Sequence, residues 1–284
     1  PDFGISGEGE LAFPQLLEAL GDDRGKQFGA AASLLRGGLA RVPNLHRFVD
    51  GKVVSNPAAS GFLDLDALSL PPRDVVSPAY YTHAGVENVQ TKRGCALRCD
   101  YCTYPIIEGR AVRKREPEAV VDEMIARRDA GVGIEHFFIV DSVFNIPPAH
   151  AKAICRTMIE RGWSTPWTCY VNPIGFDEEL AELMTASACA GIEIGSDSGC
   201  DEILAKLNKG FTTERVRRLS EACSKHQLPD CHTFLLGTPG ETLDHVKRSL
   251  DFIIDLDPFA AVIMAYKDDE EAVDPARAEI RQRL

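Results

Sequence analysis

From about residue 86 the chain alternates short apolar runs with longer helical segments, and this alternation restricts the possible folds more than any other feature. The apolar runs cover 87–92, 135–141, 166–172, 191–196, 231–236 and 260–266. Helical patterns cover 117–130, 148–161, 177–188, 201–207, 213–226, 241–255 and 274–284. Strands separated by helices pair in parallel through right-handed crossovers. The sequence therefore predicts an α/β domain over residues 86–284, either a doubly wound sheet or an incomplete barrel.

The first 85 residues follow a different pattern. Residues 3–9 predict a strand that meets a glycine turn, and a helix follows over 10–20. Two short β-prone runs flank Asp50-Gly51, a pair that favours a hairpin turn. Residues 56–85 are rich in Pro, Ser, Asp and Gly and predict a connecting segment. We therefore divide this part into a strand-turn-helix unit (1–25) and a linker with a small hairpin (26–85), and we expect both chain ends to continue in a longer protein.

Composition excludes several classes of protein. The chain has 31 Lys and Arg against 43 Asp and Glu, a formal charge of −12, which repels a phosphate backbone and argues against nucleic-acid binding. The basic run of Arg110, Arg113, Lys114 and Arg115 predicts a solvated loop or a small-anion site. No apolar run approaches the roughly 20 residues of a membrane-spanning helix. Nine cysteines without a secretory signal favour a reducing compartment, so we expect a cytoplasmic protein.

Three cysteines stand directly after the first predicted strand, at the edge of the sheet where functional groups collect. Cys95, Cys99 and Cys102 have C-x3-C-x2-C spacing. Three thiolates can hold three corners of a 4Fe-4S cube and leave the fourth iron open. An open iron can bind amino and carboxylate groups and pass an electron to an adjacent sulfonium. The alternatives are a zinc site, which needs a fourth Cys or His, and a cluster that only carries electrons.

The other six cysteines lack paired metal spacing and predict buried free thiols. They are Cys155, Cys169, Cys189, Cys200, Cys223 and Cys231.

The cysteine segment, with Tyr101 as the aromatic residue before the third cysteine, resembles the signature of radical S-adenosylmethionine (SAM) enzymes. The resemblance covers residues 86–266. It implies a partial (β/α)6 TIM-like barrel, a 4Fe-4S cluster and SAM as cofactors, and reductive cleavage of SAM to methionine and a 5′-deoxyadenosyl radical that abstracts hydrogen from a small-molecule substrate. An electron donor such as flavodoxin or ferredoxin is the implied partner.

The same resemblance implies SAM contacts at the strand ends. These are Tyr101, Asp141, Ser142, Asn172, Glu193, Ser196, Leu236 and Gly237. Asp141, Asn172 and the neighbouring Asp197 have an alternative role as caps of the following helices. Glu193 stands between Ile192 and Ile194, where an unpaired carboxylate is costly to bury, so we expect it to meet a cofactor hydroxyl or a basic partner.

Further sequence segments resemble the cobalamin-binding branch of these enzymes. They comprise Gly7-Glu8-Gly9-Glu10 before an apolar helix, the hairpin, the 63–72 connector and the Pro239-Gly240-Glu241-Thr242 turn. In that branch the opening strand and helix end a Rossmann-like cobalamin domain, and many members methylate carbon or phosphorus. The Asp-x-His-x-x-Gly loop that supplies a lower axial ligand is not in this sequence.

Three hypotheses follow. The first is a cobalamin-dependent methyltransferase acting on a small metabolite, with residues 1–25 as the end of a truncated Rossmann-like domain. The second is a cobalamin-independent radical SAM enzyme such as a cyclase, oxidoreductase or methylthiotransferase. The third is a non-catalytic iron-sulfur or zinc module.

Overall fold

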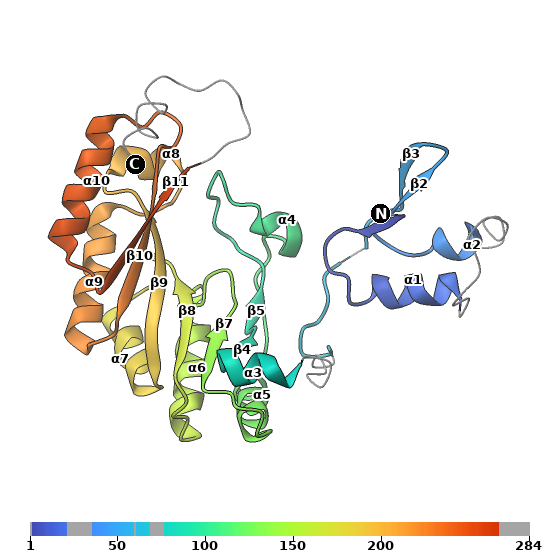
Figure 1. Cartoon of the computed structure of the whole chain (residues 1–284), viewed down its shortest axis with the longest axis horizontal. Helices are drawn as coiled ribbons and strands as arrows, with labels where there is room; N and C mark the ends of the chain where they lie inside the picture. The colour runs from blue at the N-terminus through green and yellow to red at the C-terminus, as the bar shows by residue number, and fades with distance from the viewer. Residues whose placement is uncertain (1, 22–35, 60, 69–76, 267–284) are drawn as a thin grey trace.

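A six-stranded parallel sheet forms the main body of the protein (Figure 1). The computed structural model describes residues 2–21, 36–59, 61–68 and 77–266. The strand order is β11-β10-β9-β8-β7-β4. Their bounds are β4 Val86–Val89, β7 His136–Ile139, β8 Trp167–Val171, β9 Cys189–Asp197, β10 Asp230–Leu236 and β11 Ala260–Ala265. Neighbours in the sheet are thus neighbours in the sequence, as the predicted alternation requires.

Helices join the strands and cover one face of the sheet (Figure 1). They are α5 Pro117–Asp129, α6 Pro148–Glu160, α7 Glu178–Ala186, α8 Asp201–Lys206, α9 Thr213–His226 and α10 Leu243–Leu256. Polar caps fix two of the starts: the Asp177 carboxylate accepts the Leu180 amide of α7, and Thr242 forms a capping box with His245 in α10. The helix predicted over 274–284 lies outside the described residues.

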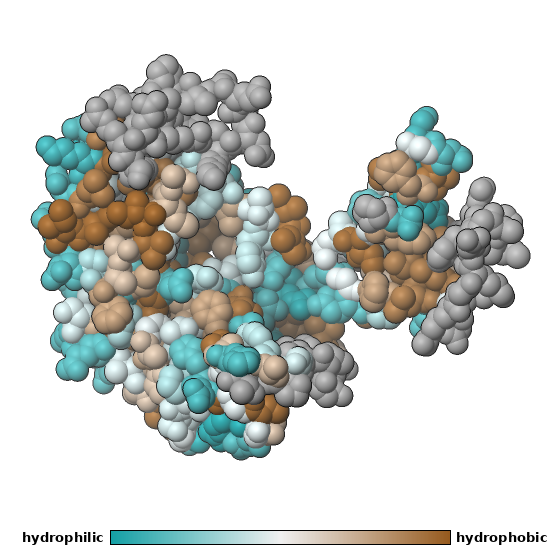
Figure 2. All heavy atoms as spheres, viewed as in Figure 1, coloured by the Kyte–Doolittle hydropathy of each residue, from teal (hydrophilic) through white to brown (hydrophobic). Residues whose placement is uncertain are grey.

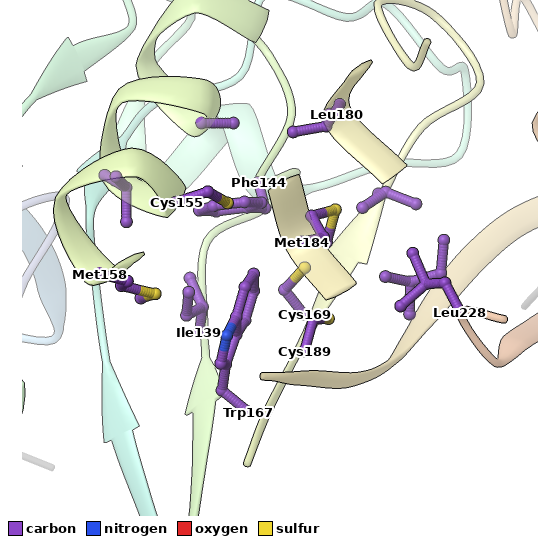
Figure 3. Close-up of a cluster of buried hydrophobic side chains, with 14 of the residues drawn as sticks. Ile139, Phe144, Cys155, Met158, Trp167, Cys169, Leu180, Met184, Cys189 and Leu228 are labelled. Atoms are coloured by element: carbon purple, nitrogen blue, oxygen red, sulfur yellow. The ribbon is translucent and has the colours of Figure 1, made fainter. Parts of the chain in front are cut away.

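The hydrophobic core lies between the sheet and these helices (Figure 3). At its centre Trp167 is completely buried, and its indole Nε1 donates to the Ser187 carbonyl at 2.7 Å. Cys155, Cys169 and Cys189 pack in the same cluster (Figure 3). All six remaining cysteines are free thiols; five are buried, as predicted, whereas Cys231 is half-buried.

The opposite face of the sheet, here called the inner face, carries the other set of alternating side chains. Phe138 and Tyr170 meet there edge to face with ring centroids 5.2 Å apart. Tyr170 is 41% exposed, and Glu193 lies beside it in register on β9. This face therefore keeps polar and aromatic side chains accessible, in contrast to the sealed helix face.

The N-terminal residues form a separate small sheet. Strands β1 (Phe3–Ile5), β2 (Leu45–Val49) and β3 (Lys52–Ser55) pair antiparallel beside α1 (Ala12–Leu20) and the short α2 (Arg36–Leu39). The predicted hairpin is confirmed, with positive φ at Asp50 and Gly51. The predicted opening strand and helix are present, but β1 pairs antiparallel with β2, whereas a Rossmann unit pairs in parallel. The described residues therefore do not show a Rossmann-like remnant.

Helix α1 presents large apolar side chains to solvent. Leu11, Phe13 and Leu17 are each more than half exposed, and Figure 2 shows apolar surface on this N-terminal part. In the ranges that the structure describes, no helix combines the length and apolar character needed to cross a membrane.

Four short elements were not predicted, one at the end of the predicted linker and three between the first and second strands of the main sheet. They are α3 Pro78–Ala84, β5 Lys92–Arg93, α4 Tyr104–Glu108 and β6 Arg113–Lys114. Strands β5 and β6 pair antiparallel and enclose the cysteine segment. They form a two-stranded ribbon at the base of the loop.

Two residues of the basic run predicted as a solvated loop or small-anion site, Arg113 and Arg115, pair instead with carboxylates of the chain itself. Arg113 donates to Glu8 at 2.6 Å, and Arg93 donates to the same carboxylate at 3.0 Å. Arg115 pairs with Glu123 at 2.7 Å. Burial works against ionisation of Glu8, but the hydrogen bonds from Arg113, the Leu63 amide and Arg93 lower its pKa overall. The prediction was wrong for Arg113 and Arg115, because their acidic partners are not their neighbours in the sequence.

Candidate active site

The three cysteines lie in a loop between β5 and α4 that begins with a tight backbone contact. Gly94 has φ of +88°, and its amide donates to the Glu108 carboxylate at 3.0 Å. A Cβ at this position would lie 2.1 Å from the carbonyl oxygen of Ala111. The next amide, of Cys95, donates to the Gly109 carbonyl at 3.1 Å. Only glycine fits where the loop passes this close to the backbone.

The loop opens onto a cavity of about 200 Å³ at the carboxyl edge of the sheet. Cys95 is buried, Cys99 is half-buried and Cys102 is exposed. All three line this cavity, together with Leu97, Tyr101, Tyr104, Ser142, Val143, Tyr170, Val171, Asn172, Gly195 and Lys209. Side chains from the loop and from the ends of β7, β8 and β9 thus converge at one place.

The donor set fits an iron-sulfur cluster with one open iron. Burial raises the pKa of Cys99, the charge of Lys209 works against this rise, and Asp197, Cys102 and Cys95 add to it. A structural zinc site needs a fourth protein ligand beside three cysteines. The lining contains three thiols and no histidine among the described residues.

A partly buried network links the cysteine loop to the end of β9. The Tyr101 hydroxyl donates to the Asp197 carboxylate at 2.6 Å. The Lys209 ammonium donates to both, at 3.0 Å from the Tyr101 oxygen and 2.7 Å from Asp197. Burial opposes the charge of Lys209, but Asp197 and Tyr101 raise the pKa of the lysine overall. A fixed positive charge therefore stands at the wall of the cavity.

The segment that carries Lys209 also holds the loop through its backbone. The Asp100 amide donates to the Leu207 carbonyl at 3.2 Å, and the Asn208 amide group lies 3.5 Å from the Asp100 carboxylate. Residues 207–209 follow α8 directly. The loop is thus fixed to the β9–α9 connection at the residues that surround Tyr101.

A second buried network lies beneath the loop. Asp141 is 1% exposed and accepts four hydrogen bonds, from the Thr91 amide and hydroxyl and from the Lys92 amide and ammonium. The Lys92 ammonium also donates to the carbonyls of Val143 and Phe144. Asp141 does not line the cavity in the described structure; its carboxylate joins the ends of β4 and β7.

The other predicted cofactor contacts divide into two groups. Ser142 and Asn172 line the cavity beside Tyr101; the Asn172 side-chain oxygen accepts the Ile174 amide at 2.8 Å. Four residues lie outside the lining: Glu193, Ser196, Leu236 and Gly237. Their roles as SAM contacts stay predictions.

Each of these four has a distinct environment. Glu193 is half-buried on the inner face beside Tyr170. Burial of Tyr170 raises the pKa of this tyrosine, and the charge of Glu193 raises it further. Ser196 is buried on the helix face. The Leu236 carbonyl accepts the Tyr266 amide at 2.7 Å, and the Gly237 amide donates to the Glu241 carboxylate at 2.5 Å.

Sequence reasoning missed Lys209 and Tyr104 as lining residues. Lys209 lies 108 positions after Tyr101, between two predicted helices, and its local sequence Asn-Lys-Gly resembles an ordinary helix end. Burial raises the pKa of Tyr104 to about 12, which keeps its hydroxyl protonated at the cavity wall. Neither feature has a local sequence signal.

The loop and its cavity agree with the comparison to known families. Residues 89–253 match the model of the radical SAM superfamily. The chain belongs to the radical SAM superfamily. This membership implies a 4Fe-4S cluster and SAM as cofactors. The matched range contains all three cysteines and the carboxyl ends of the first five strands of the main sheet, β4, β7, β8, β9 and β10.

Relatives and solved structures extend this result. The chain is 33% identical over 201 residues to a tryptophan 2-C-methyltransferase of Streptomyces laurentii, covering 66% of this chain and 33% of that protein. It is 27% identical over 258 residues to an uncharacterized methyltransferase of Pyrococcus horikoshii, covering 90% of this chain and 53% of that one. The chain therefore spans only a third to about half of the relatives that it matches.

The fold is similar to that of the radical SAM methyltransferase TsrM from Kitasatospora setae, solved with tryptophan and a SAM analogue. The TM-score is 0.74 at 28% identity, over 92% of this chain and 50% of that one. Another structure of TsrM contains cobalamin and a 4Fe-4S cluster. The similarity confirms the predicted partial-barrel architecture of the main sheet.

Replacing Gly94 tests the close contact at the start of the loop. We expect Gly94→Ala to reduce iron bound after anaerobic reconstitution severalfold, because the added methyl group would clash with the Ala111 carbonyl and displace Cys95. Gly131→Ala is the matched control, since Gly131 also has positive φ but no atom within 4 Å of the added Cβ. Iron and sulfide per chain measure the effect. Equal iron content in both variants would contradict the role of the contact.

Proposed function

We propose that this chain is the catalytic part of a cobalamin-dependent radical SAM methyltransferase that acts on a small metabolite. The observation that carries the catalytic part of the proposal is the convergence of three thiols and one buried cation on a single cavity. A plain electron carrier has no need for a cation and an open cavity beside its cluster. A non-catalytic module is therefore the least favoured hypothesis.

The residues of the loop would hold the cofactor as follows. Cys95, Cys99 and Cys102 would bind three irons of a 4Fe-4S cluster, which supplies the electron for cleavage of SAM when it is bound. Tyr101 would contribute its backbone to the adenine pocket, while its hydroxyl is fixed by Asp197. Ser142 and Asn172 present polar groups to the same cavity.

Lys209 would bind the carboxylate of the methionine part of SAM. Its ammonium is held by Asp197 and Tyr101 and needs no side-chain reorganisation to meet an anion. Lys209 is only 5% exposed, so water screens its charge weakly and a carboxylate beside it gains a strong, charge-assisted hydrogen bond. Of the remaining predicted contacts, Asp141, Glu193, Leu236 and Gly237 would act from the strand ends around this position.

The methyltransferase part of the proposal rests on the relatives. A tryptophan methyltransferase and TsrM are similar to this chain, and TsrM binds cobalamin. We propose that residues 1–25 end a cobalamin-binding type domain, 26–85 form a linker and 86–284 form the barrel. The exposed apolar side chains of α1 support this division, because such a surface favours contact with further protein. A flavodoxin- or ferredoxin-like donor would supply electrons.

A second candidate is a cobalamin-independent radical SAM enzyme. It is favoured by the antiparallel pairing of β1 with β2, which differs from a Rossmann unit. The two candidates share the cysteine loop and its cavity. They differ in whether the protein binds a corrinoid.

Cleavage of SAM is the direct test of the catalytic proposal. After anaerobic reconstitution with iron and sulfide, we expect the chain with dithionite and SAM to form 5′-deoxyadenosine or S-adenosylhomocysteine, measured by mass spectrometry. Cys99→Ala should abolish the product because one iron loses its ligand. Cys200→Ala, which removes a buried thiol outside the cavity, is the control. If the fully loaded chain forms neither 5′-deoxyadenosine nor S-adenosylhomocysteine, the enzyme assignment is refuted.

The role of Lys209 makes a separate prediction. We expect Lys209→Met to weaken SAM binding to the cluster-loaded protein by about 10- to 100-fold, because a buried charged hydrogen bond is lost. Lys206→Met is the matched control, since Lys206 is exposed three residues away and donates to the Gly240 carbonyl. Titration of the cluster's electron paramagnetic resonance spectrum with SAM gives both dissociation constants. Similar dissociation constants for Lys209→Met and Lys206→Met would show that Lys209 does not bind SAM.

Corrin retention separates the two candidates. We expect the longer protein that contains this chain, reconstituted with hydroxocobalamin and then desalted, to keep a corrinoid absorbance in proportion to protein if the first candidate is correct. A longer protein that cleaves SAM but keeps no corrinoid would support the second candidate. Serum albumin carried through the same desalting step controls for nonspecific retention.

A further inference from the structure

A chain of buried hydrogen bonds runs behind β9, on the helix face of the sheet. The Ser196 hydroxyl lies 2.7 Å from His232 Nδ1, and His232 Nε2 lies 3.0 Å from the Asp230 carboxylate. Asp230 also accepts the Phe259 amide at 2.9 Å and the hydroxyl of Ser220 from α9. Ser196 and His232 are 0% exposed. No substrate can reach this Ser-His-Asp set, so it does not act as a nucleophilic triad.

The hydrogen bonds form one chain from Asp230 through His232 to Ser196. In the tautomer that donates from Nε2 to the Asp230 carboxylate, Nδ1 accepts the hydroxyl proton of Ser196. Burial works against ionisation of Asp230, but its hydrogen bonds from His232, Phe259 and Ser220 lower its pKa overall and keep it an acceptor. The rotamer of Ser196 is therefore set by its neighbours on β10.

Ser196 occupies an irregular position in the sheet. On β10, Thr233 pairs with Gly195 and Phe234 pairs with Asp197, so the register shifts past Ser196. Such a bulge changes the direction of the side chains that follow it. The Ser198 amide then donates to the Ser196 carbonyl at 2.7 Å, forming a three-residue turn around Asp197.

Asp197 sits in that turn with φ of +60°. This left-handed conformation is unfavourable for a residue with a Cβ and persists only where its surroundings hold it. In front of β9, the Asp197 carboxylate meets Tyr101 and Lys209. Behind β9, the residue directly before it is held by His232. The two networks therefore meet at one strained turn.

We propose that His232 is a positioning residue, which holds Ser196 at the bulge and thereby aims the Asp197 carboxylate at Lys209. Its effect on SAM rests on the proposed function of Lys209. The predicted direct contact of Ser196 with SAM is replaced, in this proposal, by an indirect role through the backbone.

Kinetics of SAM cleavage by the reconstituted chain test the proposal. We expect Ser196→Ala and His232→Leu each to raise the KM for SAM by about tenfold with kcat changed less than about threefold, because the losses act on binding. His232→Asn should recover most of the loss, since its side-chain oxygen can accept the Ser196 hydroxyl. Ser187→Ala is the matched control: Ser187 is equally buried and donates to the Met184 carbonyl at 3.0 Å, away from the cavity.

A purely structural role would give a different result. In that case Ser196→Ala and Ser187→Ala would lower the melting temperature alike and leave the KM for SAM unchanged in both. That outcome would overturn the proposal. A failure of His232→Asn to restore KM while His232→Leu raises it would also overturn it, because the hydrogen bond to Ser196 would then not be the cause.

A double-mutant cycle makes the outcome independent of SAM. His232→Leu and Asp197→Asn alter side chains on two strands, and we expect their effects on the free energy of unfolding to be non-additive if Ser196 couples them. Additive effects overturn the positioning role whether or not SAM is cleaved. Coupled effects in a chain that cleaves no SAM would refute the proposed function alone.

Discussion

The arrangement of the cysteine loop depends on one buried ion pair beneath it. Asp141 at the end of β7 and Lys92 in β5 are 2.8 Å apart and almost completely buried. Breaking such a pair by removing one partner costs about 3–5 kcal/mol, because the other charge is left in a medium of low polarity. The same carboxylate also fixes the amides of residues 91 and 92. The backbone is thereby set three residues before Cys95, and the loop starts from a fixed point.

Much of the fold could be predicted because strands and helices are separated by clear turn residues. All six predicted strands of the main sheet are present with small changes at their ends. The two-residue strands β5 and β6 could not be predicted, since a run of two residues has no periodicity. Their pairing is set by backbone contacts such as that of Gly94 with Ala111, which have no local sequence signal.

Site residues could be predicted where their spacing in the sequence is characteristic, and they were missed where they depend on contacts between distant parts of the chain. Cys95, Cys99 and Cys102 are recognisable because three thiols within eight residues suit few purposes. Lys209 becomes important only when the chain folds back on Tyr101, and its burial depends on Asp197. Asp141 followed its strand as expected, yet its oxygens are engaged by Thr91 and Lys92, which only the paired strands bring together.

The three cysteines differ in exposure, and they therefore differ in how readily an oxidant from solvent reaches them. Thiol oxidation follows access as well as thiolate character, and Cys102 is exposed whereas Cys95 is buried. An oxidant arriving from solvent therefore meets the sulfur of Cys102 first, while Gly94 and Glu108 keep Cys95 in place. Damage in air would begin at the outer end of the loop and spare its anchored end.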